Sequence, residues 1–422
     1  MGELARTLSV WRGTAMMLNI VLGAGLLTLP GLAVRSAGDA ALLVWAACAL
    51  VALPLLIVFA LLGRRHPSSG GIAGILARGM GDFGYVAGTL LFLGAVAFGL
   101  PAIALTGGHY AATIAGGSPY AWALGLVVAA ALANAISAEV AGRINATLAS
   151  LLLFVLIGVV VVGWQTVDPN SGHWSRGPIE IPSVSVLGTV FMMVFFAFTG
   201  WELGANLGAE FRNPRRDFPI AMGLSFVIVV ALYAMLAVIV QAAGLTSGYA
   251  APYAVIFERA FGAAGQTAIS LIAVLLIFAN LTAAIWAVSR MIYAAASERL
   301  LPAMLTRVTR SVPVPAVLAT VMAIVGMLLA AWADLIHLGL LLAVAGQNFL
   351  LLYGAAAAVL IRTSDVVWQK RLGWLCVMLV SCLVALRGLD GLLYPCALLS
   401  AAALIAQAPA RQKFRRHVEG TI

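Results

Sequence analysis

The most informative stretch of the sequence is Val190-Phe191-Met192-Met193-Val194-Phe195-Phe196-Ala197-Phe198-Thr199-Gly200-Trp201-Glu202-Leu203-Gly204. Its acidic residue, Glu202, lies ten residues before Arg212, where a basic cluster begins. At ~1.5 Å of helical rise per residue, this spacing puts Glu202 about 15 Å from the cluster, which is half the thickness of a ~30 Å hydrocarbon core. A carboxylate at that depth is costly and indicates a functional site. Gly200 and Gly204 interrupt the apolar run, as is typical of a broken helix.

The composition is that of a multispanning helical membrane protein. Hydrophobic residues make up 63% of the 422 residues and charged residues 9%, with a mean hydropathy of +1.07, whereas a soluble domain carries ~25% charged residues. Apolar runs longer than ~18 residues exclude an outer-membrane barrel, whose strands are short and alternate in hydrophobicity. The pattern predicts twelve spans, over residues 12–34, 40–63, 84–114, 119–139, 144–165, 185–209, 218–243, 264–296, 315–332, 334–361, 373–388 and 391–409.

The net charge of +9 is distributed as in a membrane protein rather than a nucleic-acid-binding one. If the N-terminus is cytoplasmic, twenty Lys and Arg residues fall on the cytoplasmic side of the predicted spans, and four fall outside: Arg35, Arg176, Arg259 and Arg387. This asymmetry follows the positive-inside rule. It predicts an integral protein of the cell membrane, in bacteria the inner membrane, with both termini cytoplasmic. Its basic loops would face lipid headgroups, and no nucleic-acid partner is expected.

Two of the predicted spans are interrupted by glycine, and they stand five spans apart. The first contains Gly23-Ala24-Gly25, with Gly23 eleven residues past Arg12 and so about 16 Å into the bilayer. The sixth contains Gly200 at a similar depth. Matching breaks in two five-span units indicate an inverted-repeat transporter. The chain then divides into a first repeat, residues 1–170, a second repeat, residues 171–362, and a C-terminal part, residues 363–422, with the last two spans and a basic tail.

A break at the membrane midplane exposes backbone amides and carbonyls, which is tolerated where they line a cavity or meet a ligand. A zwitterionic amino acid suits such a site, because helix N-termini favour its carboxylate and helix C-termini its ammonium group. The carboxylate is assigned to Gly23, Ala24 and Gly25. The ammonium group is assigned to the carbonyls of Phe198, Thr199 and Gly200, with Glu202 beside it.

Both assignments have a structural alternative. Gly23 and Gly25 are also the small residues of close helix packing. Glu202 also fits a structural carboxyl, protonated or hydrogen-bonded to backbone groups that the break frees. In either case Glu202 should face protein or water rather than lipid.

Other residues in the spans are weaker candidates for the lining of a pocket: Asn19, Phe98, Asn280, Trp286 and Asn348. Hydrogen bonding between helices and ordinary packing are the competing roles for them. No lysine or arginine lies deep in a predicted span, so a site for an acidic side chain is not expected. The sequence has no Walker lysine motif, no metal-binding His/Glu cluster and no Ser/His/Asp set in the spans. We therefore expect no metal, no cofactor and no enzymatic activity.

Several blocks of the sequence resemble the amino acid/polyamine/organocation (APC) superfamily. They are Gly23-Ala24-Gly25 followed by Pro30, Pro67-Ser68-Ser69-Gly70-Gly71, and Phe198-Thr199-Gly200-Trp201-Glu202 with Ala209-Glu210-Phe211-Arg212-Asn213-Pro214-Arg215-Arg216-Asp217-Phe218-Pro219. The similarity runs over nearly the whole chain. Within the superfamily, the chain most resembles short bacterial permeases that export methionine and branched-chain amino acids. The blocks that support this resemblance are Gly63 to Gly71, Gly99-Leu100-Pro101-Ala102 and the span-six block.

The resemblance implies a LeuT-like fold of two inverted five-helix repeats plus two extra helices, with alternating access around spans one and six. It also implies that Gly23 to Gly25 bind the carboxylate, that Phe198 to Glu202, with Trp201 among them, form the ammonium side, and that Glu202 takes part in proton-linked gating. Span five departs from the pattern of some proton-coupled relatives, because it has Asn145, Thr147 and Ser150 but no lysine to replace a sodium ion. Proton coupling through Glu202, facilitated diffusion and exchange therefore all stay open.

The sequence thus predicts a secondary active transporter of neutral apolar amino acids, namely methionine, leucine, isoleucine and valine, with proton-coupled export by alternating access. The alternatives are an uptake permease, an amino acid/amine exchanger, or, in another class, a membrane subunit that does not transport. The expected partners are the amino acid, protons and the bilayer, and a homodimer is compatible with the sequence.

Overall fold

The computed structural model describes residues 8–65, 71–136, 153–166, 180–204, 210–309 and 312–407. Within these ranges the chain is helical and has no β-strand beyond the isolated bridges Leu8–Phe211 and Thr309–Val312. Eight of the described helices are long and apolar enough to cross a membrane, and shorter apolar helices cover Pro119–Asn134, Leu153–Thr166 and Gly391–Gln407. The predicted all-helical membrane class is confirmed. Asn145, Thr147, Ser150 and residues 67–70 lie outside the described ranges.

The described helices differ from the predicted spans at several boundaries, most of all where α4 and α10 begin more than ten residues earlier than expected. In chain order they are α1 (Val10–Val21), the 3-10 turn η1 (Ala24–Leu27), α2 (Leu29–Ala37), η2 (Gly38–Ala40), α3 (Ala41–Arg65), α4 (Gly71–Ala115), α5 (Pro119–Ile136), a helix over Leu153–Thr166, α7 (Val184–Phe195), η3 (Phe196–Phe198), α8 (Trp201–Gly204), α9 (Asp217–Ala242), α10 (Pro252–Ser297), η5 (Ala303–Thr306), α11 (Val314–Trp332), α12 (Leu338–Thr363), α13 (Val367–Ala385) and α14 (Gly388–Gln407).

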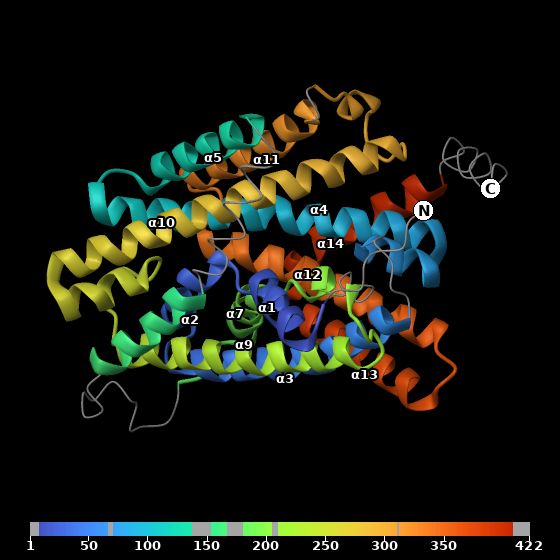
Figure 1. The fold of residues 1–422 in the computed structure, drawn as a ribbon, viewed down its shortest axis with the longest axis horizontal. Coiled ribbons are helices and arrows are strands. Elements are labelled where there is room, and N and C mark those ends of the chain that lie inside the picture. Colours follow the sequence, from blue (N-terminus) through green and yellow to red (C-terminus); the bar gives the residue numbers. More distant parts are fainter. Residues whose placement is uncertain are drawn as a thin grey trace.

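The helices form layers around two interrupted segments (Figure 1). Helices α3 and α9 run side by side along one side of the molecule, and α5 and α11 lie along the opposite side. Helices α1, α7 and α12 lie between them, and α12 packs against both α4 and α7. The two breaks, one between α1 and α2 and the other between α7 and α8, therefore lie in the interior of the bundle.

Close backbone contact fixes α12 on the helix that leads into the second break. A Cβ atom on Gly346 of α12 would lie 1.9 Å from the carbonyl oxygen of Met192 in α7. No side chain fits there, because real Cβ atoms do not approach a carbonyl this closely. The contact is of the small-residue type that lets membrane helices approach each other.

Two long helices bend sharply at a glycine with a positive φ angle. In α4 the bend is at Gly81 (φ 59°, ψ −145°), and in α10 it is at Gly262 (φ 65°, ψ −160°). Glycine adopts this conformation readily because it has no Cβ atom. Each bend separates a short helix from the long apolar helix that follows it.

Candidate functional site

The first break begins where α1 ends at Val21. Leu22 and Gly23 have extended ψ angles of 93° and 160°, and the chain becomes helical again in η1 at Ala24. The first amides of a helical segment have no partner within that segment, and Ala24 and Gly25 hold these first positions. The structure therefore places the start of a helical segment at the glycine pair that the sequence singled out.

The second break follows α7 and η3. Thr199 is extended (φ −98°, ψ 170°), and Gly200 has a φ of +108°, which glycine tolerates far better than other residues. A Cβ atom on Gly200 would lie 3.2 Å from the carbonyl oxygen of Ile20 and 3.3 Å from the Cα of Val21. The backbone of the second break thus lies directly against the end of α1.

Glu202 is buried at the start of α8, with 2% of its surface exposed. Its Oε2 atom accepts a hydrogen bond from the backbone amide of Gly200 at 3.0 Å and another from the hydroxyl of Tyr353 in α12. The carboxyl therefore satisfies a backbone donor freed by the break, as the structural interpretation expects. It also lines the cavity described below, so the geometry is compatible with both roles.

Three other buried tyrosines satisfy carbonyls at the breaks. Tyr233 of α9 donates to the carbonyl of Ala197 at 2.9 Å and lies 3.4 Å from that of Val21, so its hydroxyl joins the two breaks. Tyr110 of α4 donates to the carbonyl of Leu27 at 2.8 Å, and Tyr253 of α10 donates to that of Leu26 at 3.2 Å. These hydroxyls supply the partners that unwound backbone needs away from water.

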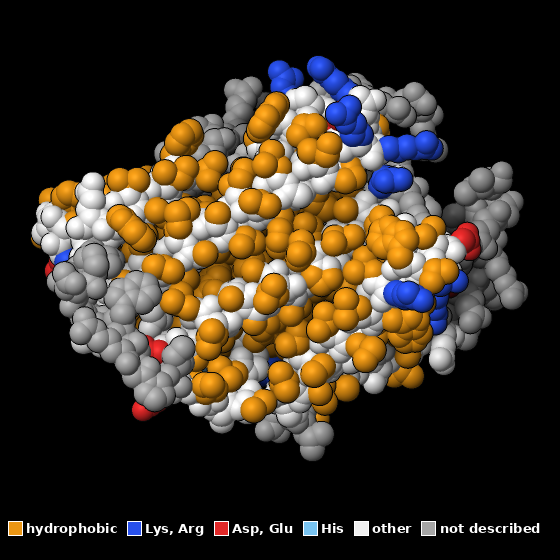
Figure 2. Space-filling model, turned by 90° about the horizontal axis from the view of Figure 1, so that it is seen from below, with side chains coloured by type: hydrophobic (Ala, Val, Ile, Leu, Met, Phe, Trp, Pro, Cys, Tyr) orange, Lys and Arg blue, Asp and Glu red, His pale blue; other side chains and the backbone are white. Residues whose placement is uncertain are grey.

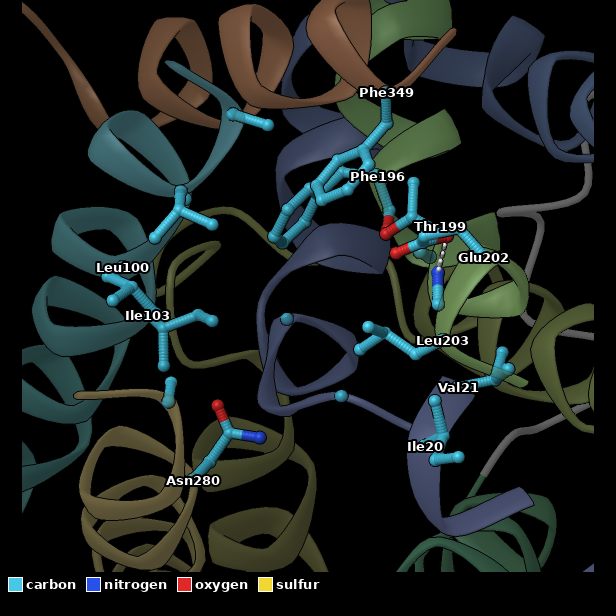
Figure 3. Close-up of a pocket in the computed structure, with 18 of the residues that line it drawn as sticks. Ile20, Val21, Leu100, Ile103, Phe196, Thr199, Glu202, Leu203, Asn280 and Phe349 are labelled. Carbon is cyan, nitrogen blue, oxygen red and sulfur yellow. Dashed lines mark hydrogen bonds between the residues drawn. The ribbon is translucent and has the colours of Figure 1, made fainter. Parts of the chain in front are cut away.

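A cavity of about 200 Å³ lies between the two breaks. In Figure 3, Phe196 and Phe349 lie above the cavity, Leu100 and Ile103 to the left, and Glu202 with neighbouring Thr199 to the right. The full lining is Ile20, Val21, Gly23, Gly25, Leu26, Phe92, Ala95, Val96, Gly99, Leu100, Ile103, Phe196, Ala197, Thr199, Gly200, Glu202, Leu203, Asn280, Ala284 and Phe349. The volume is below the ~300–1,000 Å³ of drug-sized sites, so the cavity suits a small ligand.

Six of the residues predicted for the site lie together on the wall of this cavity: Gly23, Gly25, Thr199, Gly200, Glu202 and Asn280. Two others are behind the second break rather than on that wall. The ring of Phe198 packs against Trp45 and Tyr233, and that of Trp201 packs against Phe226. Their contribution is to hold the break in place. The backbone of Ala24 lies in η1, between two lining glycines.

The remaining predicted lining residues are not on the cavity wall. The ring of Phe98 packs against Tyr394, and Trp286 is 38% exposed with the guanidinium of Arg290 3.8 Å from its ring centre. Asn348 is buried and donates to the carbonyl of Val344 within its own helix. Asn19 is half-buried in α1.

Sequence reasoning missed the apolar wall and the tyrosines. Phe92, Ala95, Val96, Gly99, Leu100 and Ile103 recur at intervals of three and four along α4, which is the spacing of a single helix face. That spacing is visible in the sequence and could have identified the wall. The tyrosines had no comparable signal, because their partner carbonyls lie 36 to 227 residues away in the chain.

The interrupted helices, the buried carboxyl and the small apolar cavity define a membrane transporter for a small molecule. The chain belongs to the amino acid permease family, whose pattern matches residues 8–402, and its predicted place in the APC superfamily is confirmed.

Three bacterial relatives show the extent of the similarity. The chain is 31% identical to the uncharacterized amino acid permease YecA of Bacillus subtilis, over 94% of this chain and 95% of the relative. It is 28% identical to the L-methionine/branched-chain amino acid exporter YjeH of Escherichia coli, over 71% and 72%. It is 25% identical to the inner membrane transport protein YbaT of Escherichia coli, over 92% and 90%. The family and these relatives are transporters rather than enzymes.

Proposed function

We propose that the chain is a secondary active transporter of neutral apolar amino acids, with methionine, leucine, isoleucine and valine as its substrates. The observation that carries this proposal is the cavity between the two breaks, whose polar lining residues lie at the breaks, apart from Asn280 of α10, and whose remaining wall is apolar. A small, mostly apolar site with a few placed polar groups is the usual form of a small-molecule site.

The two ends of the substrate backbone would meet opposite ends of broken helices. The amides at Gly23 to Gly25 begin a helical segment and suit the carboxylate. On the other side, the carbonyl of Phe196 already accepts from the Thr199 hydroxyl at 2.8 Å, and that of Ala197 accepts from Tyr233. The carbonyls of Phe198 and Thr199 are therefore the acceptors that we assign to the ammonium group, with Glu202 beside them.

The apolar wall would determine the choice of side chain. Phe92, Leu100, Ile103 and Phe349 face the cavity, and no lysine, arginine or histidine is among the described residues that line it. An acidic substrate side chain would find no counter-ion, and a basic one would find Glu202, whose Oε2 atom already accepts two hydrogen bonds. Neutral aliphatic and thioether side chains fit this wall best.

The arrangement of breaks and bends supports a LeuT-like fold with twelve spans. Gly81 follows Gly23 by 58 residues, and Gly262 follows Gly200 by 62, so each broken segment is succeeded by a bent helix at nearly the same distance. We propose inverted repeats over residues 1–170 and 171–362, followed by two additional spans. The break in each repeat would then belong to the part that moves during alternating access.

Proton-coupled export is the proposed mode of action. Glu202 is the acidic residue among the described residues of the cavity wall, so its protonation would change the charge at the ammonium side of the site. The similarity to YjeH, an exporter of methionine and branched-chain amino acids, supports that direction. A bacterial inner-membrane location with cytoplasmic termini follows from the charge asymmetry and is supported by the relative YbaT.

Transport of radiolabelled leucine and methionine in vesicles containing the purified protein tests the proposal. We expect movement of both amino acids to saturate, to be faster with an imposed pH gradient, and to be unaffected by excess glutamate. A chain that neither binds nor moves either amino acid would be a non-transporting subunit, and the proposed function would be wrong. Transport of both amino acids at the same rate with and without the pH gradient would refute proton coupling but would not contradict the substrate assignment.

A further inference from the structure

Two larger cavities lie outside the proposed substrate site, along the seam between α3 and α9. One, of about 470 Å³, is lined by Leu53, Leu56, Ile57, Ala60, Leu61, Arg64, Pro219, Met222, Gly223, Phe226 and Val227. The other, of about 460 Å³, is lined by Leu42, Trp45, Ala46, Ala49, Leu50, Phe198, Val230, Tyr233, Ala234, Ala237 and Val238. We call the first the Arg64 groove and the second the Trp45 groove.

The grooves belong to the outer face of the bundle. Figure 2 shows the face that carries α3 and α9, with apolar side chains over most of it and Lys and Arg side chains gathered toward its right-hand end. Lining residues Leu50 and Val227 are 73% and 64% exposed. In a membrane this apolar surface would face lipid tails.

The Arg64 groove has the length and polarity of one phospholipid molecule. From Leu53 to Arg64 is eleven residues of α3, or about 16 Å at ~1.5 Å per residue, which is half of a ~30 Å hydrocarbon core. Arg64 lies exposed at one end, and exposed Arg215 and Arg216 precede the α9 residues that form the other wall. Apolar walls ending in arginines are complementary to an acyl chain that ends in an anionic headgroup.

The groove also contacts the back of the second break. Phe226, which lines it, packs against Trp201 with ring centres 5.9 Å apart. Trp201 is buried in α8 and immediately precedes Glu202 in the chain. An occupant of the Arg64 groove would thus contact Phe226, whose ring packs against Trp201 of α8.

We propose that the Arg64 groove binds an anionic phospholipid, with an acyl chain along α3 and α9 and the phosphate at Arg64, and that the bound lipid supports the conformation of α8. Its occupant is assigned as a lipid rather than a second copy of the chain, because the recess spans a single leaflet and carries its positive charges at one end.

Native mass spectrometry of the full purified chain tests lipid binding without requiring transport. The probes are phosphatidylglycerol and phosphatidylcholine with identical acyl chains. We expect the wild type to retain phosphatidylglycerol with about fivefold preference, as one arginine near an anionic headgroup provides. Arg64→Gln should reduce this preference, and Arg64→Gln combined with Arg215→Gln and Arg216→Gln should abolish it, whereas Arg371→Gln, at an exposed arginine of α13, should keep it.

A second variant fills the groove without disturbing the fold. A Cβ atom on Gly223 would meet open space, so Gly223→Leu should be accommodated and should occupy the groove. It should lose bound lipid of both kinds, whereas Gly326→Leu, at an equally open and exposed glycine of α11, should retain it. Equal retention of both lipids by the wild type, or unchanged lipid binding in Gly223→Leu, would overturn the proposal. A dimer with crosslinks between groove residues of its two copies would also overturn the proposal.

The effect on α8 rests on the proposed transport function and needs a separate measurement. Leucine transport should be faster in phosphatidylglycerol vesicles than in phosphatidylcholine vesicles, and Gly223→Leu should remove the difference. Transport at equal rates in both lipids would refute the effect on α8. If leucine is not transported in vesicles of either lipid, the proposed function is wrong. The lipid-binding proposal is then still decided by the mass-spectrometry result alone.

Discussion

Replacing Tyr233 by phenylalanine would remove the hydroxyl that joins the two breaks and keep the ring that packs behind them. The ring lies against Trp45 and Phe198, with centres 5.7 Å and 5.2 Å away, and phenylalanine keeps both contacts. The hydroxyl donates to the carbonyl of Ala197 and lies near that of Val21. The substitution therefore removes the link between the breaks and little else.

The size of the effect follows from burial. Tyr233 is 1% exposed, so bulk water does not replace the lost donor. A buried acceptor left without its partner costs about 1–3 kcal/mol, which corresponds to a change of about 5–150-fold in an equilibrium constant. Because both breaks contribute to the proposed substrate cavity, we expect Tyr233→Phe to lower the apparent unfolding temperature and to raise the dissociation constant for leucine within that range.

Thermal unfolding of the detergent-purified protein, followed by binding of radiolabelled leucine, would measure both effects. Tyr120→Phe is a suitable control, since Tyr120 is half-buried and its ring stacks on Trp332, away from both breaks. If Tyr233→Phe unfolds and binds leucine as the wild type does, the hydroxyl does not hold the breaks together and the reasoning is refuted.

Three other substitutions give separate tests of the site and its surroundings. Glu202→Gln keeps the shape of the side chain but cannot titrate, so leucine affinity measured across a pH series should lose its pH dependence; an unchanged profile would favour the purely structural role. Phe349→Ala enlarges the apolar end of the cavity and should shift relative affinity, measured by competition, from valine toward bulkier apolar amino acids; the same order of affinities as in the wild type would contradict this placement. Gly346→Ala puts a Cβ atom against the Met192 carbonyl and should abolish a monodisperse peak in size-exclusion chromatography, and a normal peak would show that the contact can relax.

The sequence was sufficient to locate the breaks, because they depend on local properties. Gly23, Gly25 and Gly200 interrupt apolar runs, and glycine is the residue that tolerates the φ angle of +108° found at Gly200. Depth relative to the basic residues then placed both breaks near the midplane. The lining role of Glu202 follows from the same two facts.

The rest of the site depends on contacts between distant segments. Tyr353 reaches Glu202 from 151 residues away, and nothing near Tyr353 in the sequence marks it as a donor. Trp286 was predicted to line the pocket but is 38% exposed. An aromatic residue in an apolar helix gives the same sequence pattern whether it faces a cavity or the outside of the bundle. Helix rotation decides between these outcomes, and it is set by the packing of neighbouring helices.

Gly25 offers the sharpest test that a neutral amino acid binds between the two breaks. A Cβ atom there would lie 3.5 Å from the ring of Phe196, an ordinary contact, so alanine fits whereas a leucine side chain would enter the cavity. Binding of radiolabelled leucine to purified Gly25→Ala and Gly25→Leu, with Gly326→Leu as the control, should show near-normal affinity for Gly25→Ala and the control and no measurable binding for Gly25→Leu. Undiminished binding by a folded Gly25→Leu protein would contradict the proposed site.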